Sequence, residues 1–330
     1  MEKVLTISIA AYNAEKYLSK CLNSLLNSNV KEKLEIIIVN DGSIDQTLEI
    51  ANSFSLNYPN VVKVINKENA GHGSTINESI KVATGKYYKI LDSDDWVDVD
   101  GLEKLVNYLE TNTVDMVLNP YHEIYIDTGA SILKKPYSEN QELNKILDII
   151  HISEVNIYMH SLTFNTSVVK QMGPIIDENC FYVDMEYTCF AVAYVKTFVC
   201  LNFPVYQYML GSNEQSMSTK NLVKRREQHL KVLKRLVNFY INIEEDNKIK
   251  KTILNRIKYA ILNQYKIYFN INDEKIAQKE IILFDQWLLN NFKIGYYGPK
   301  SRFMYIIRLL RHGKFKFFKL PYAIFYGTKI

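Results

Sequence analysis

The first 120 residues alternate between short β-rich runs and helical patterns, and this alternation constrains the fold more than any other feature. One run, "LEIIIVN", is apolar throughout, as a strand covered on both faces should be. Repeated strand–helix–strand units produce a mostly parallel sheet with flanking helices. The predicted strands are 4–12, 34–40, 61–66, 87–91 and 115–119, and the predicted helices are 14–28, 42–54 and 74–84.

Beyond residue 120 the pattern becomes mixed and then helical. A hairpin is predicted at 119–135, short strands near 160 and at 198–210, and a helix at 184–195. From 220 to about 291 the periodicity is helical. We therefore predict a Rossmann-like α/β domain over 1–215, followed by a smaller, mainly helical region over 216–330.

Three residues are predicted to mark helix ends in the α/β domain. Asn13 is placed as the N-cap of the first helix and Ser43 at the start of the second, because both side chains can accept hydrogen bonds from unpaired backbone N–H groups. Gly85 is placed at the C-terminal end of the third helix.

Polar clusters follow each of the first four predicted strands. They are "AYN", "NDGS", "NKENAGHG" and "DSDD". Because ligands of such sheets bind beyond the carboxyl ends of the strands, these clusters are expected to meet at one edge. Gly42 permits a tight turn there, and the carboxylate of Asp41 could accept hydrogen bonds from a base or a ribose.

The acidic cluster is the least ordinary of the four. Asp92, Asp94 and Asp95 follow a buried-strand pattern, with only Ser93 among them. Like charges this close repel one another, so a positive partner is needed. In an extended segment Asp92 and Asp94 face the same way, and together they suit a hard divalent cation such as Mn²⁺ or Mg²⁺. For a motif this short, taken alone, helix capping by Asp95 or Asp98 is the better explanation.

These clusters as a set resemble those of the family 2 glycosyltransferases. The resemblance rests on "ISIAAYNAEKYLSKCLNSLL", "EIIIVNDGSIDQTLEIA", "NKENAGHGSTINESIKVATGKYYKILDSDDW" and "FYVDMEYTCF", in the family's order, over residues 4 to about 210. It implies a GT-A fold that transfers sugar, with inversion, from a UDP-sugar to a hydroxyl of a glycan, lipid-linked or protein-linked acceptor. The cofactor that it implies is Mn²⁺ or Mg²⁺.

The resemblance also assigns roles by position. Asp94 is implied as the principal metal ligand, with Asp92 on the ribose or the metal. Asp184 falls on the position of the general base, which takes the proton from the acceptor hydroxyl, although it could instead N-cap its helix. The residues implied to bind the nucleotide sugar are Ala11, Tyr12, Asn13, Glu15, Asp41, Asn69, Gly71, Asp92 and Ser93.

Two positions depart from the family's pattern. Val183 stands where relatives carry a Glu before the base, and Ile76 stands where many carry an Arg. His72 or Ser74 could replace the contact of that Arg, although an exposed loop histidine is an equal alternative for His72.

Two further segments carry candidate polar residues. His160, in the apolar run "IYMHSLTF", is expected to be a core histidine rather than a residue of the acceptor cleft. Ser216 and Ser218 lie where relatives have a mobile loop that closes over the diphosphate.

Composition places the chain among soluble globular proteins, with 47% hydrophobic and 23% charged residues. Its four cysteines lack metal-type spacing and are expected to be buried thiols in a reducing compartment. The N-terminus lacks the pattern of a secretion signal, and no apolar run approaches the ~18 residues that a spanning helix needs. We therefore expect a cytoplasmic protein.

The net charge of +4 conceals an asymmetry. From Gln286 to Ile330 there are nine Lys or Arg and no acidic residue, so residues 1–285 carry a net −5. Basic and aromatic residues alternate in 300–330, which suits an anionic membrane surface or a contact in a homo-oligomer. No nucleic-acid-binding motif accompanies the charge, so nucleic acid is not expected as a partner.

Two other functions fit parts of the pattern. A sugar-nucleotide pyrophosphorylase has a related sheet, but it needs a Gly-rich loop with a basic residue after the first strand, where this chain reads "AAYNAEKY". A catalytically silent partner subunit of a glycan synthase is favoured by Val183 and Ile76. The intact Asp92, Asp94 and Asp184 argue against it.

Overall fold

The computed structural model describes residues 2–152, 155–173, 175–211, 218–244, 249–297, 302–313 and 315. The chain divides into two compact units, and each is described by itself. Unit 1 comprises Met1–Ser212 and Glu245–Thr252, and unit 2 comprises Asn213–Glu244 and Ile253–Ile330.

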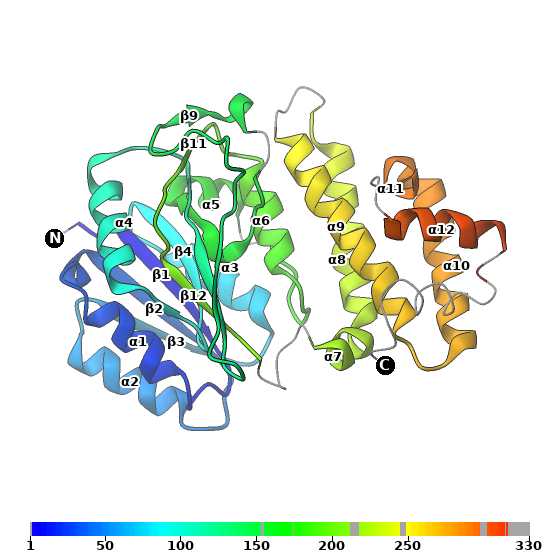
Figure 1. Ribbon diagram of the computed structural model, residues 1–330. Coiled ribbons are helices and arrows are strands. Elements are labelled where there is room, and N and C mark those ends of the chain that lie inside the picture. The colour runs from blue at the N-terminus through cyan, green and yellow to red at the C-terminus, as the bar shows by residue number, and fades with distance from the viewer. Residues whose placement is uncertain are drawn as a thin grey trace. The chain divides into compact units, whose positions relative to one another are not determined.

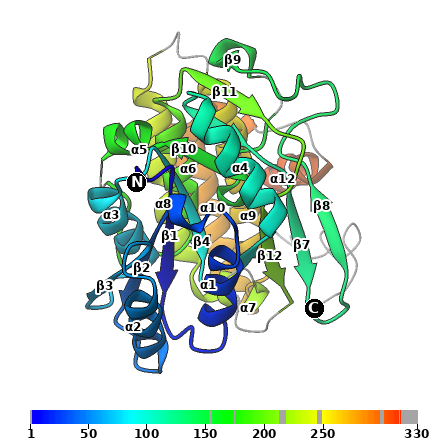
Figure 2. The same cartoon turned by 90° about the vertical axis from the view of Figure 1, so that its left-hand side faces the viewer.

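Unit 1 is built around an eight-stranded sheet. Its strands are β1 (Leu5–Ala11), β2 (Leu34–Asp41), β3 (Val62–Lys67), β4 (Tyr87–Asp92), β6 (Met116–Leu118), β9 (Leu147–Asp148), β10 (Leu162–Asn165) and β11 (Thr197–Cys200). Their order is β3-β2-β1-β4-β10-β6-β11-β9, and Figure 2 shows β3, β2 and β1 side by side. The first four run parallel, as the alternating pattern predicts, whereas β10 lies antiparallel between β4 and β6.

A second, four-stranded sheet also belongs to unit 1. It consists of β5 (Trp96–Val97), β7 (Tyr121–Tyr125), β8 (Ser131–Lys134) and β12 (Tyr206–Leu210), in the order β5-β12-β7-β8. The antiparallel pair β7–β8 confirms the hairpin predicted at 119–135. Because β5 directly follows the acidic turn and pairs with β12, the second sheet brings Tyr206 to that turn.

Helices cover both faces of the large sheet (Figure 1). On one face lie α1 (Leu18–Leu26), α2 (Thr47–Asn57) and α4 (Val99–Thr111), and on the other α3 (His72–Val82), α5 (Thr166–Met172) and α6 (Asp184–Val192). Alternate side chains of β1 show the division: Ile7 and Ile9 enter the apolar core under α1 and α4, whereas Ser8 Oγ donates to Ser79 Oγ of α3 at 2.7 Å. Short 3₁₀ turns are η1 (Lys31–Lys33), η2 (Ile149–His151) and η3 (Met159–Ser161).

Unit 2 is helical in its described residues. It contains α7 (Thr219–Lys224), α8 (Arg226–Asn242), most of α9 (Lys250–Phe269), α10 (Glu274–Asn291), α11 (Lys293–Tyr297) and α12 (Arg302–His312). The Arg226 guanidinium of α8 donates to Glu280 of α10, with Nε 2.8 Å from Oε2. His229 and Gln264, on α8 and α9, are hydrogen-bonded at 2.6 Å. The predicted loop residue Ser216 lies outside the described residues, and so do Lys314 and 316–330 of the tail.

Two predicted helix starts are wrong. The N-cap of α1 is Tyr17, and Asn13 instead adopts a left-handed conformation, with a φ of 49°. Its Oδ1 accepts from the backbone N–H of Ile44 at 3.0 Å, and its own N–H donates to Ser43 Oγ at 3.0 Å. Both side chains therefore join two loops instead of starting helices, and α2 begins only at Thr47.

The predicted helix end at Gly85 is also wrong. The C-cap of α3 is Ala83, and a Cβ on Gly85 would lie 2.6 Å from the backbone nitrogen of Thr6. The glycine thus permits a close approach of two backbones. Capping by Asp98 is confirmed, because its Oδ1 accepts from the N–H of Gly101 at 2.7 Å in the first turn of α4.

The cysteines are buried, as predicted. The four cysteine side chains are all buried: Cys21, Cys180, Cys189 and Cys200. Among the helices that the structure describes, none has the length and the apolar character needed to cross a bilayer.

A buried carboxylate ties together the amino ends of the parallel strands. Glu35, at the start of β2, is 1% exposed. Its Oε1 accepts from Lys63 Nζ at 2.7 Å, and its Oε2 accepts from Thr6 Oγ1 at 2.6 Å and from the N–H of Thr84 at 2.7 Å. Burial alone would raise the pKa of Glu35, but the hydrogen bonds from Lys63, Thr6 and Thr84 outweigh it and lower the pKa to about 2.

Glu35→Gln should therefore remove stability that depends on pH. Because the folded pKa lies below the ordinary value of 4.5, the stabilisation is present above that value and is lost as the pH falls toward 2. Its size is on the order of 3 kcal/mol. Urea unfolding should show a larger loss for Glu35→Gln at neutral pH than at pH near 3, whereas the exposed control Glu49→Gln should change little at either. An equal loss at both pH values would contradict the prediction.

Candidate active site

The loop after β1 carries four of the predicted nucleotide-binding residues. Ala11 is buried at the end of the strand, and the Tyr12 side chain is 54% exposed. Glu15 Oε2 accepts from the backbone N–H of Gln46 at 3.1 Å, and Asn13 also bonds to the loop after β2. The two loops are therefore interlocked, and Tyr12 is left as an exposed ring at this edge of the sheet.

Asp41 organises the loop after β3. It is 3% exposed, and its Oδ1 accepts from Lys67 Nζ at 2.7 Å and from the N–H of Ala70 at 2.9 Å. Its Oδ2 accepts from the N–H of Gly71 at 2.8 Å, where the φ of 83° favours glycine. Asn69 is exposed beside them. The structure thus gives Asp41 a role in loop geometry, and its contact with a base stays a prediction.

The segment before α6 is packed onto α3. A Cβ on Gly73 would lie 1.9 Å from the carbonyl oxygen of Asp177, so only glycine allows this approach. The Asn77 side chain donates to the carbonyl of Ile176 at 2.9 Å and accepts from its N–H at 3.1 Å. These contacts fix the segment that precedes α6, whose first residue is Asp184.

The two departures from the family pattern are both buried. Ile76 lies inside α3, and Val183 occupies the N-cap position of α6 without a side-chain cap. Asp184 is therefore not the N-cap of its helix, which removes the structural alternative proposed for it. Ser218, the other predicted loop serine, is the N-cap of α7, and its Oγ accepts from the N–H of Asn221.

The acidic residues lie on a turn and not on a continued strand. β4 ends at Asp92, and the N–H of Asp95 donates to the Asp92 carbonyl at 3.1 Å. The reason given for Asp92 and Asp94 facing the same way is therefore wrong, because the alternation of an extended segment stops at Asp92. Ser93 is buried, and His72 Nε2 lies 3.7 Å from Oδ1 of Asp92, whose side chain is 29% exposed.

Asp95 is bonded to β12 and does not cap a helix. The Tyr206 hydroxyl donates to Asp95 Oδ2 at 2.5 Å, and the N–H of Met209 donates to Asp95 Oδ1 at 2.7 Å. The same hydroxyl oxygen accepts from the N–H of Asp92 at 3.1 Å. Tyr206 therefore fixes both ends of the acidic turn.

The carboxylates at this edge raise one another's pKa values. Burial raises the pKa of Asp92 and the charge of Asp184 raises it further, while His72 opposes the shift. Burial and the charge of Asp92 raise the pKa of Asp94 to about 6. Burial and the charges of Asp94 and Asp92 raise that of Asp95. Asp184 therefore lies close enough to the turn to act on it, and the edge favours a bound cation.

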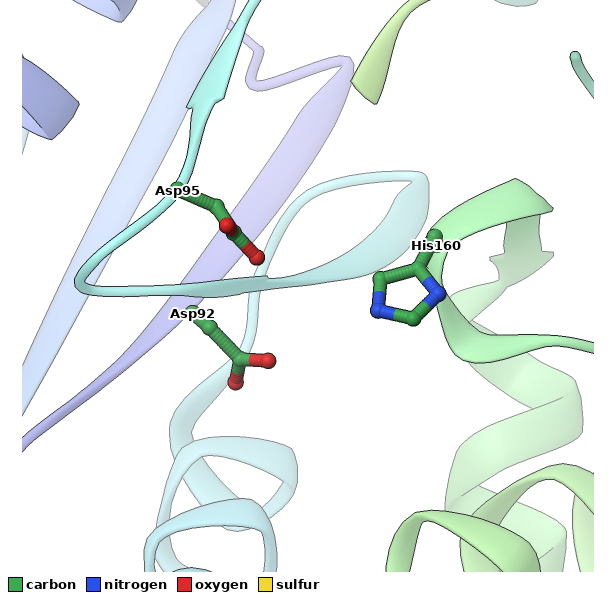
Figure 3. A group of neighbouring side chains, drawn as sticks. All are labelled: Asp92, Asp95 and His160. Atoms are coloured by element: carbon green, nitrogen blue, oxygen red, sulfur yellow. The ribbon is translucent and has the colours of Figure 1, made fainter. Parts of the chain in front are cut away.

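Asp92, Asp95 and His160 form a group able to hold a metal ion. One ligand atom of each lies within 4.8 Å of the others, and Figure 3 shows the three side chains pointing toward one another. The His160 ring stacks on Tyr208, with ring centroids 4.1 Å apart, and meets the edge of Tyr206 at 4.9 Å. Two carboxylates and an imidazole are donors that Mn²⁺ accepts. The expected core histidine is thus half-buried at the site.

Lys89 supports the segment that carries His160. Its side chain is wholly buried within β4, and its Nζ donates to the carbonyls of His160 at 2.9 Å and of Leu162 at 3.0 Å. Burial lowers the pKa of Lys89 to about 7. The sequence pattern treats this position as one more residue of a buried strand, so its supporting role is visible only in the fold.

With this geometry in view, the chain can be compared with known proteins. Residues 6–169 match the family model Glycosyl transferase family 2. The chain belongs to glycosyltransferase family 2. This match contains all the residues predicted to bind the nucleotide sugar or the metal, whereas Asp184 lies outside it.

Similar proteins include an uncharacterized glycosyltransferase of Haemophilus influenzae, 26% identical over 80% of this chain and 88% of that protein. The poly(ribitol-phosphate) beta-glucosyltransferase of Bacillus spizizenii is 33% identical over 51% of this chain, but the match spans only 26% of that protein's length. The structure of S. aureus TarS 1-349 in complex with UDP-GlcNAc superimposes with a TM-score of 0.72 at 16% identity, covering 97% of this chain and 91% of TarS 1-349. The predicted GT-A fold is confirmed.

Lys89→Met should weaken Mn²⁺ binding by about tenfold, because Lys89 holds the segment of the candidate ligand His160 and outer contacts of metal ligands typically contribute that much. Isothermal titration calorimetry with Mn²⁺ measures this directly. Lys86→Met is a matched control: Lys86 lies before β4 and its Nζ also donates to two carbonyls, those of Leu109 and Asn112, away from His160. The control should leave the affinity unchanged. Equal affinity in Lys89→Met and the unaltered protein would rule out the supporting role.

Proposed function

We propose that the chain is an inverting glycosyltransferase that moves a sugar from a UDP-sugar to a hydroxyl of a glycan, lipid-linked or protein-linked acceptor, in the synthesis of cell-surface polysaccharide or glycoconjugate. The observation that carries this proposal is the cluster of Asp92, Asp95 and His160 at the carboxyl end of β4, and the charge of Asp184 on α6 raises the pKa of Asp92 in this cluster. The similarity to a poly(ribitol-phosphate) glucosyltransferase supports the acceptor class, and the likeness to TarS bound to UDP-GlcNAc supports a uridine nucleotide.

The donor would bind across the interlocked loops at the carboxyl edge. Tyr12 offers an exposed ring for stacking on the base, while Asn13 and Glu15 hold its loop in place. The loop that Asp41 organises, with Asn69 and Gly71, lies at the same edge. We assign the nucleotide sugar to this edge, with Asp92 and Ser93 beside the ribose and phosphates.

The donor atoms at the acidic turn fit a divalent cation. Asp92, Asp95 and His160 would hold Mn²⁺ or Mg²⁺, and Asp94 stays a predicted ligand from the same turn. When bound, the ion supplies positive charge that stabilises the diphosphate as leaving group. Tyr206 keeps the turn in shape, because its hydroxyl bonds to both Asp92 and Asp95.

Asp184 is assigned as the general base. Inverting transfer is a single in-line displacement, so a carboxylate must take the proton from the attacking hydroxyl. Asp184 opens α6 without serving as its N-cap, and its charge already acts on the acidic turn. Gly73 and Asn77 on α3 fix the segment that precedes α6 at Ile176 and Asp177, which supports a defined position for the Asp184 carboxylate.

A catalytically silent partner subunit is the second candidate. It is favoured by two buried apolar residues: Val183 stands where relatives carry a glutamate, and Ile76 stands where many carry an arginine. Such a subunit would bind a nucleotide sugar without cleaving it. Release of UDP from a panel of UDP-sugars with Mn²⁺ distinguishes the two functions, because only the enzyme gives metal-dependent release.

Asp184→Asn should lower UDP release with acceptor by at least about 100-fold, because the base is lost, while UDP binding measured by calorimetry stays unchanged. Asp94→Ala should instead weaken Mn²⁺-dependent UDP binding. Asp100→Asn, an exposed acid on α4, is the control and should affect neither quantity. Transfer by Asp184→Asn at the unaltered rate would show that another residue is the base.

A further inference from the structure

The outward side of α11 is apolar and basic. Lys293, Ile294 and Tyr297 are exposed on this short helix, and the Tyr297 side chain is 61% exposed. Large exposed apolar side chains that cluster with bases on one element are unusual on a surface that contacts only water.

The outward side of α12 has the same character. Tyr305 is 61% exposed and Leu309 is 54% exposed, and the half-buried Arg308 lies between them. Residues three and four apart lie on one face of a helix, so these three form a continuous stripe. The next turn of the stripe carries the exposed His312.

The opposite side of α12 is fixed to unit 2. Arg311 Nε donates to Asp285 Oδ1 at 2.8 Å, and the Arg311 guanidinium lies 3.6 Å from the ring centroid of Tyr296. Arg308 donates to the backbone carbonyl of Tyr297, so the two helices adjoin at their outward sides. The side chains at these outward sides are defined here as the α11–α12 surface: Lys293, Ile294, Tyr297, Tyr305, Arg308 and Leu309.

Charge decides which partner fits the α11–α12 surface. The surface contains two basic residues, Lys293 and Arg308, and no acidic residue. Two copies of the surface placed together would repel one another. A soluble polyanion would pair with the basic side chains, but it would leave Tyr297, Tyr305 and Leu309 exposed to water. An anionic bilayer meets both requirements, since its headgroups take the bases and its interface takes aromatic and aliphatic side chains.

We propose that the α11–α12 surface binds an anionic lipid bilayer, with Tyr297, Tyr305 and Leu309 entering the headgroup region. Lys293 and Arg308 would contact lipid phosphates beside them. Basic side chains beside an anionic bilayer are attracted to its headgroups, which favours this orientation of Lys293 and Arg308. This interaction goes beyond sugar transfer and does not depend on the nucleotide site.

Co-sedimentation of the full chain with vesicles tests the proposal. Vesicles of phosphatidylcholine mixed with phosphatidylglycerol should bind the protein, and phosphatidylcholine alone should bind it weakly. The double substitution Tyr305→Ser with Leu309→Ser should reduce binding to the anionic vesicles by about tenfold, because two apolar side chains no longer enter the interface. The matched control is Leu283→Ser, an exposed leucine on α10 outside the surface, and it should bind as before.

Three outcomes would overturn the proposal. The first is no binding of the unaltered protein to the anionic vesicles. The second is binding that high salt abolishes but that the Tyr305 and Leu309 substitutions leave unchanged, which would indicate contact through charge alone. The third is a change of oligomeric state in the double variant, measured by light scattering without lipid, which would assign the surface to a second copy. Because UDP release is measured separately, failure here leaves the proposed transfer untouched.

Discussion

Repulsion among carboxylates at one edge of a parallel sheet is the constraint on which the site depends. Two other buried carboxylates that organise this fold form salt bridges with lysines: Glu35 with Lys63, and Asp41 with Lys67. In the turn after β4, Asp95 is held instead by neutral donors, the Tyr206 hydroxyl and the backbone N–H of Met209. The pKa of Glu35 is accordingly lowered, whereas burial and neighbouring charges raise those of the acidic turn. A cation bound at this turn would offset the repulsion among its carboxylates, which the rest of the fold does not neutralise.

The sheet could be predicted because its signal is local. Each of the parallel strands is an apolar run followed by a helical period, and the observed bounds of β1 to β4 differ from the predicted ones by only a residue at either end. Helix ends were harder. Asn13 and Ser43 have the side chains of N-caps, but they bond across two loops that meet only when β1 and β2 pair. Local propensity was overridden there by a tertiary contact.

The site was predicted in outline and missed in detail for the same reason. Asp92, Asp94 and Asp184 could be chosen from motif order, but His160 reaches the acidic turn because β10 inserts antiparallel beside β4, a pairing that no periodicity encodes. Asp95 is an aspartate like its neighbours, so the sequence could not distinguish its role from that of a helix cap. Its hydrogen bonds to Tyr206 and Met209, seen only in the structure, define that role. The sequence shows which residue types are available for the site. Which of these side chains lie close together could be learned only from the fold.

Lys89 shows how far the site extends into the core. A buried strand position is ordinarily filled by an apolar residue, and burying an ammonium without a carboxylate is costly. Here the ammonium satisfies two carbonyls, of His160 and Leu162, and an apolar residue at this position would leave both without that donor. The same strand therefore presents Asp92 at its end and fixes the segment of His160 from its middle. The cluster is thus preorganised by two strands, because β4 supplies Asp92 and Lys89 while Tyr206 and Met209 of β12 hold Asp95.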